Sequence, residues 1–231
     1  MRMTMAAAIA LLLLAPGQSE ARARADRASA SAVDPDALCL VIVRGAALGS
    51  KQASADTMRD IETAFAYFAG RVSARNEAGA ITPMVAAALE WNPPKREYDL
   101  KGLTCMAYGM SGADGRPADR DPPSAGQAAA AAADPDVGCA FLMHAAKADP
   151  ASVHAPPARQ RGVGIAAAYY AGRVTGRHGA SAYKGLLAEA ANAPEAGEQS
   201  QSLSDECFRG GSRGIHAVNL EIDAALPKRR G

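Results

Sequence analysis

The sequence predicts an all-α fold, built as a tandem duplication of a helical-bundle unit that a disulfide closes. Of the 231 residues, 48% are apolar but only 5% are aromatic, and much of the apolar share is alanine, which favours helix over strand. Apolar residues in the best-patterned segments recur at helical spacing. Landmark residues, cysteines among them, recur about 100 positions apart. Large β architectures are therefore not expected.

Residues 1–25 have the pattern of a secretory signal peptide. Arg2 precedes an uninterrupted apolar run at 6–15, and Pro16, Gly17 and small residues follow. A run of this length is too short to cross a bilayer core of about 30 Å, so a permanent membrane anchor is the weaker interpretation. We expect the chain to be exported to a bacterial periplasm or secreted after cleavage.

A duplication is indicated by landmarks that recur in register. Asp34-Pro35-Asp36 returns at 134–136, and each triplet precedes a cysteine, Cys39 or Cys139, by three residues. The segment YFAGRVSAR at 67–75 returns as YYAGRVTGR at 169–177. A second cysteine closes each unit, at Cys105 and Cys207. These landmarks predict helical units at 26–110 and 134–231, joined by a Gly-, Pro- and Ala-rich linker at 111–133.

The helices of each unit are predicted from stripes of apolar residues. Between 58 and 72 such residues are separated by three or four positions, which places them on one helix face, and the equivalent stripe lies within 158–174. The segment 40–43 is β-branched enough for a strand, but its counterpart at 140–143 favours a helix. The predicted helices are 38–44, 58–72, 83–91, 139–148, 158–174, 181–193 and 215–226.

Gly70 and Gly172 occupy equivalent places inside the strongest helical pattern. Glycine there costs about 0.5–1 kcal/mol relative to alanine. Its recurrence predicts either a helix–helix contact too close for a β-carbon or the approach of a ligand or partner.

Four cysteines in an exported chain predict two disulfides, for which three connectivities are possible. The repeat selects Cys39 with Cys105 and Cys139 with Cys207. Each bridge closes a loop of nearly 70 residues, and the entropy removed from the unfolded chain corresponds to roughly 4 kcal/mol. Metal binding is the competing use, but the cysteines and histidines lack the paired spacing of closed zinc sites.

Motifs typical of enzymes are incomplete in this chain. Residues 210–214 match G-x-S-x-G, but no strand precedes them, and we interpret them as a glycine-rich lead into the last helix. Gly162 begins a G-x-G-x-x-A match that also lacks a preceding strand. The histidines, at 144, 154, 178 and 216, have no counterparts in the first unit, so no catalytic base is shared by both units. We assign no catalytic residue, metal ligand or cofactor.

The repeated residues with the strongest functional character are tyrosines and arginines on the central helices. Two arginines four positions apart share a helix face and can hold a carboxylate or phosphate by forked hydrogen bonds. The alternative is a solvated face near a helix C-terminus, where positive charge suits the helix dipole. The candidate binding residues are Tyr67, Arg71, Arg75, Tyr169, Arg173 and Arg177.

The charge balance argues against nucleic acid as a partner. With 25 basic and 24 acidic residues the net charge is only +1, so no field would gather a polyanion or an anionic membrane surface.

An exported helical module with an Asp five residues before one cysteine and a distant second cysteine resembles the small acid-stress periplasmic chaperones. The resemblance rests on Asp34, Cys39 and Cys105, and on their counterparts in the second unit. Those chaperones are single, shorter modules with a narrower cysteine interval. The chain also resembles exported bacterial proteins with a tyrosine-glycine-arginine core between two cysteines. The resemblance to the acid-stress chaperones implies a disulfide-closed helical domain that exposes apolar surface at low pH.

The sequence therefore predicts a non-enzymatic exported protein that acts as a binding, scaffold or stress-related module. Its expected partner is an unidentified protein or a small anionic ligand. Two alternatives remain: a periplasmic acid-stress chaperone, and an enzyme with a site in the cleft between the units.

Overall fold

The computed structural model describes residues 33–50, 52–76, 80–114, 134–191 and 200–226, and all regular structure in these ranges is helical. The predicted all-α class is confirmed. The first half contains α2 (Pro35–Gly49), α3 (Ala55–Arg75), α4 (Ile81–Leu89) and α5 (Lys95–Ala113). The second half contains α7 (Pro135–Ala148), η1 (Pro150–His154), α8 (Pro157–His178), α9 (Ala180–Ala191) and α10 (Ser200–Ala225). The predicted signal peptide and most of the predicted linker lie outside the described residues.

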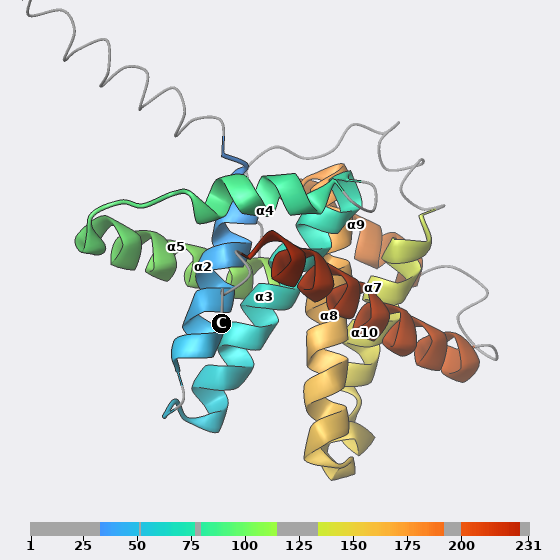
Figure 1. Ribbon diagram of the computed structural model, residues 1–231. Coiled ribbons are helices and arrows are strands. Elements are labelled where there is room, and N and C mark those ends of the chain that lie inside the picture. Colours follow the sequence, from blue (N-terminus) through green and yellow to red (C-terminus); the bar gives the residue numbers. More distant parts are fainter. Residues whose placement is uncertain (1–32, 51, 77–79, 115–133, 192–199, 227–231) are drawn as a thin grey trace, which may run out of the picture. The chain divides into compact units, whose positions relative to one another are not determined.

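The four α-helices follow one another in the same order in both halves (Figure 1). The first helix of each half begins at the repeated Asp-Pro-Asp triplet, because Asp34 and Asp134 are N-caps and the following proline occupies the first helical turn. The second helix, α3 or α8, carries the repeated tyrosine-glycine-arginine segment. The fourth helix, α5 or α10, carries the second cysteine of its half.

The halves meet where α3 crosses α8, which is the most extensive helix–helix contact among the described residues. A β-carbon added to Gly70 would lie 2.0 Å from the carbonyl oxygen of Tyr169, and one added to Gly172 would lie 2.0 Å from that of Tyr67. The backbones thus touch at both glycines. Of the two predicted interpretations, the close helix contact is the one that the structure shows.

The buried core lies along the contact between α3 and α8. On α3 the buried residues run from Ile61 to Val72, and on α8 they run from Ala166 to Thr175. The last helix, α10, belongs to the second half but also packs against α4 of the first half. There Glu221 accepts hydrogen bonds from the backbone and side chain of Thr82. From Asp34 onward the described chain forms one compact unit.

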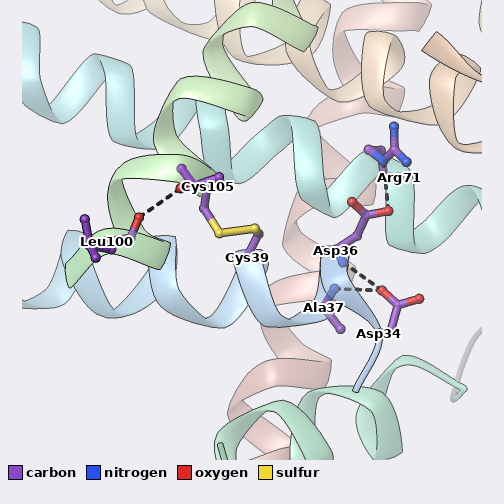
Figure 2. The surroundings of a disulfide bond; sticks show 8 residues. Asp34, Asp36, Ala37, Cys39, Arg71, Leu100 and Cys105 are labelled. Atoms are coloured by element: carbon purple, nitrogen blue, oxygen red, sulfur yellow. Dashed lines mark hydrogen bonds and ion pairs between the residues drawn. A yellow bond between two sulfur atoms is a disulfide. The ribbon is translucent and has the colours of Figure 1, made fainter. Parts of the chain in front are cut away.

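Both predicted disulfides are present and join residues within one half. Cys39 of α2 bonds to Cys105 of α5, and Cys139 of α7 bonds to Cys207 of α10. Figure 2 shows the first of these bridges, which links two helices beside the start of α2. All four cysteines of the chain are disulfide-bonded.

Two helical segments differ from the sequence prediction. No helix was predicted over 95–113, where α5 lies, and α10 begins at Ser200 rather than at 215. The predicted glycine-rich lead at 210–214 is thus helix interior. Glycines at these places normally disfavour helix, but here they accommodate tyrosine rings, with Gly112 against Tyr67 and Gly214 against Tyr169.

None of the described helices combines the length and the apolar character that a membrane span needs.

Replacing Gly70 with alanine should lower the free energy of unfolding by about 3 kcal/mol or more, because the new methyl group would meet backbone atoms that cannot rotate away. Chemical denaturation monitored by circular dichroism measures the effect. Gly164→Ala, in open space on α8, is the matched control and should raise the stability by about 0.5–1 kcal/mol. Equal stability of the Gly70 variant and the native chain would contradict the close contact.

Candidate functional site

The repeated Asp-Pro-Asp triplets are joined to the repeated arginines by ion pairs. At the start of α2, Asp34 Oδ1 accepts hydrogen bonds from the backbone N–H groups of Asp36 and Ala37, at 2.9 Å each. The second aspartate, Asp36, is buried and faces α3. The triplet thus caps the helix with one carboxylate and presents the other to the central helix.

In the first half, both candidate arginines bind Asp36. Arg71 Nε lies 2.8 Å and Arg75 Nη2 2.7 Å from the same Oδ2 atom, and Arg75 also contacts Asp34. Figure 2 shows Arg71 directed at Asp36 beside the capped end of α2. Burial by itself would lower the pKa of Arg71, but Asp36 and Tyr67 raise it above its ordinary value. Arg71 therefore stays a cation.

The second half repeats this arrangement. Arg173 Nε and Arg177 Nη1 each lie 2.7 Å from Asp136 Oδ2. His178, which has no counterpart in the first half, adds a contact of 2.9 Å from Nε2 to Asp134 Oδ2. Burial tends to raise the pKa of Asp134, but hydrogen bonds from His178, the Asp136 N–H and Arg177 hold it below its ordinary value.

The candidate tyrosines lie between the halves rather than at the surface. The Tyr67 ring is fully buried, and its hydroxyl accepts a hydrogen bond from Thr175 of the other half at 3.2 Å. The Tyr169 hydroxyl lies 3.3 Å from Ser73, the residue equivalent to Thr175. Both tyrosines connect the two halves.

These contacts give the six candidate residues partners inside the fold, rather than the solvated face of the alternative interpretation. Each arginine is already neutralised by a carboxylate of its own half, and Arg71 also stacks on the Tyr67 ring, with Cζ 5.8 Å from the ring centroid. An external carboxylate or phosphate would have to displace Asp36 or Asp136 to reach them. The predicted anionic ligand stays a prediction, and the structure gives these residues a sufficient internal role.

A wide cleft of about 1630 Å³ opens where both halves contribute side chains. Its lining comes from α3, α5, α7, η1, α8 and α10, with the apolar side chains Met58, Met110, Met143, Val163 and Phe208. Charged residues surround it as opposite pairs, such as Lys147 with Asp114 at 3.6 Å and Arg159 with Asp205 at 3.7 Å. No histidine lines this cleft, so its titratable groups are carboxylates, lysine and arginines.

A smaller apolar groove of about 450 Å³ lies between α2 and α5. Among the described residues that line it, Asp99 is the only charged one. The groove is lined by Ile42, Val43, Gly45, Ala46, Tyr98, Asp99, Gly102, Leu103 and Met106. We call this surface the α2/α5 groove. At its edge Leu103 is 70% exposed, and Leu48 and Leu100 nearby on the same helices are 60% and 56% exposed.

The equivalent positions of the second half carry different side chains. At the places of Gly102 and Leu103, α10 carries Ser204 and Asp205, which line part of the wide cleft. The position of Leu100 is taken by Ser202. The fold therefore accepts polar residues at these places, and the leucines of α5 are not required by packing in the described part of the chain.

Sequence reasoning missed the α2/α5 groove because it missed α5. α5 has no apolar stripe that would predict a helix, because its first turns are charged and glycines interrupt the rest. Two signals could have revealed it: Pro93-Pro94 ahead of a charged turn, and the register of Gly109 and Gly112 with Gly211 and Gly214.

Within the described residues, no three His, Cys, Asp or Glu side chains gather as metal ligands would. His144 instead lies 2.7 Å from the Tyr183 hydroxyl, measured from Nε2, and burial lowers the pKa of this histidine. His144 and His178 are thus bonded locally.

Asp134→Asn should lower the free energy of unfolding by about 1–2 kcal/mol at neutral pH, because the amide keeps the capping geometry but loses the charge. A carboxylate with a lowered folded-state pKa stabilises the fold above its unfolded pKa of about 4, and this stability disappears as pH falls through the folded value. The difference between variant and native chain should therefore vanish in acid. Urea denaturation across pH tests this.

Asp149→Asn is the control, because Asp149 caps η1 and makes no ion pair in the described structure. A pH-independent effect at Asp134 would contradict the ionic role.

Comparison with known protein families, curated proteins and solved structures finds no match to this chain. Proposals about its function therefore depend on the contacts described above.

Proposed function

We propose that the protein is an exported, non-enzymatic binding module that uses the α2/α5 groove to bind an apolar surface of a partner. The observation that carries this proposal is the contrast between equivalent positions of α5 and α10. The first presents Leu103 at 70% exposure, and the second presents Asp205 at the same place. A contiguous group of exposed apolar side chains that the fold does not require is typical of interaction surfaces.

The proposed compartment is the periplasm or the extracellular space. The two disulfides support it, since such bonds persist in oxidising compartments. The signal-peptide pattern at residues 1–25 supports it independently.

The equivalent helices support a further part of the proposal, that the halves are copies of one ancestral unit. Glycines, cysteines and ion pairs in the first half have counterparts about 100 residues later that make the same contacts. On this proposal the halves began alike and only the first kept or gained an apolar groove.

Filling the groove tests the binding role. A β-carbon added to Gly102 would lie 3.6 Å from Ile42, an ordinary contact, so Gly102→Gln should fold and place a polar side chain in the groove. We expect the native chain to enhance the fluorescence of anilinonaphthalene sulfonate at neutral pH, and the variant to lose most of that enhancement.

Ser204→Gln, at the equivalent place in the second half, is the matched control. Ser204 lines the wide cleft, so this variant should leave the fluorescence unchanged if the dye binds the α2/α5 groove. Equal dye binding by Gly102→Gln and the native chain would refute the groove as the apolar site.

The ion pairs favour a second candidate function, the acid-stress chaperone. The starts of α2 and α7 are attached to the central helices through Asp36 and Asp136, which carry two arginines each. Protonating these carboxylates removes the charge that the guanidiniums face. On this candidate function, loss of these charges would loosen the first helix of each half and uncover apolar core.

This candidate predicts that the protein suppresses aggregation of an acid-denatured globular client at about pH 3 but not at neutral pH. Light scattering of the client measures it. The double variant Asp36→Asn and Asp136→Asn, which lacks the charges at every pH, should suppress aggregation at higher pH than the native chain does. Client aggregation unaffected by the native chain in acid would exclude the chaperone role.

A further inference from the structure

The contact between α3 and α8 is reciprocal. A β-carbon on Gly70 would lie 2.0 Å from the Tyr169 carbonyl oxygen. A β-carbon on Gly172 would lie 2.0 Å from the Tyr67 carbonyl oxygen. The two glycines occupy equivalent positions of the repeated segment, and so do the two tyrosines. Such an exchange of partners is the property of an interface between two identical subunits related by a two-fold axis.

One pair of equivalent residues lies on this axis. Ala74 and Gly176 have the same place in the repeated segment, and a β-carbon added to Gly176 would lie 3.2 Å from that of Ala74. A residue that contacts its own equivalent lies on the axis of a two-fold contact. The hydroxyl of each central tyrosine contacts the residue that precedes Ala74 or Gly176 on the opposite helix. The contact is therefore symmetric in side chains as well as in backbone.

An ion pair at the other end of the contact breaks this symmetry. Arg161 of α8 donates from Nε to Glu62 Oε2 of α3, at 2.6 Å. The position equivalent to Glu62 is Gly164, so α8 has no carboxylate there. The position equivalent to Arg161 is Arg59. The helix α3 thus carries both partners of the pair, whereas α8 carries only the arginine.

We infer that this surface of α3 is complementary to itself, so that two copies of the chain can join through it in the register that α3 and α8 share. We call this surface the α3 face, and its residues are Arg59, Glu62, Tyr67, Gly70, Ser73 and Ala74. In the native chain α8 covers the α3 face, so a second copy gains access only where α8 is displaced. The inference goes beyond the proposed binding role, since the α2/α5 groove takes no part in it.

The chemistry of the α3 face selects a second copy as its partner. A second α3 supplies the close glycine contact and the hydroxyl partner of Tyr67 as α8 does, because Gly70 and Ser73 are the equivalents of the α8 residues. It also supplies the ion pair twice, with Arg59 of each copy facing Glu62 of the other. Opposite charges placed across a contact favour one partner and one register.

The other contacts of α3 lie within the first half and survive the exchange. The Tyr67 ring packs against Gly112, Arg71 pairs with Asp36, and the disulfide of the first half links α2 to α5. None of these contacts involves α8. A first half that is joined to a second copy would therefore keep its own helices in place.

Gly172→Leu in the full-length, oxidised chain tests the inference. The new side chain would meet the Tyr67 carbonyl oxygen and displace α8, while Gly70 stays intact on the α3 face. We expect sedimentation velocity to give a mass twice that of the native chain, and the urea midpoint to rise with protein concentration. Gly164→Leu, in open space on the same helix, is the matched control and should keep the native mass.

Two further substitutions in the Gly172→Leu chain locate the contact. Adding Gly70→Leu should abolish the association, because neither helix then permits close approach. Adding Glu62→Arg should weaken it about tenfold, because both symmetric ion pairs with Arg59 would be lost.

A Gly172→Leu chain with the native mass would overturn the inference, as would association that does not stop at two chains or that persists after Gly70→Leu. Helical circular dichroism that is lost at every protein concentration would also overturn it, because a complementary second copy would restore the fold as the concentration rises.

Discussion

The structure depends on the backbone contact between α3 and α8. At Gly70 and Gly172 each helix approaches so closely that a β-carbon on one would meet a carbonyl oxygen of the other. This approach brings Tyr67 to Thr175 and Tyr169 to Ser73, so the buried polar contacts between the halves are a consequence of it. Larger side chains at the crossing would separate the helices, and the tyrosines would lose both their partners and their glycine pockets on α5 and α10.

Each half then attaches its outer helices to this crossing in two ways. Ion pairs from the Asp-Pro-Asp triplet hold the first helix against the central one, and a disulfide links that first helix to the fourth. The chain has few large aromatic side chains to bury, so covalent and ionic contacts replace part of the area that a larger core would supply. The repeated arginines and aspartates pair with one another in this role. The proposed binding surface is therefore apolar rather than charged.

The proposed function therefore depends on the residues that differ between the halves. Shared residues such as Arg71 and Arg173 make contacts within the fold. The helices α5 and α10 differ at Leu100, Leu103 and their counterparts, although both segments are helical. Equivalent positions on α10 carry serine and aspartate, so the leucines of α5 support the proposed binding surface. The proposed binding role of the α2/α5 groove follows from this difference.

The all-helical class, the disulfide pairing and the meaning of Gly70 and Gly172 could be predicted from the sequence, because recurrence at a fixed offset tests each pattern twice. The helix α5 and the true start of α10 could not, since their glycines are helix-breaking in isolation and are stabilised only by tyrosines from α3 and α8. The sequence also could not predict that Arg71, Arg75, Arg173 and Arg177 form ion pairs inside the fold. Only the tertiary structure brings Asp36 and Asp136 to them, across a separation in sequence that no local pattern reports.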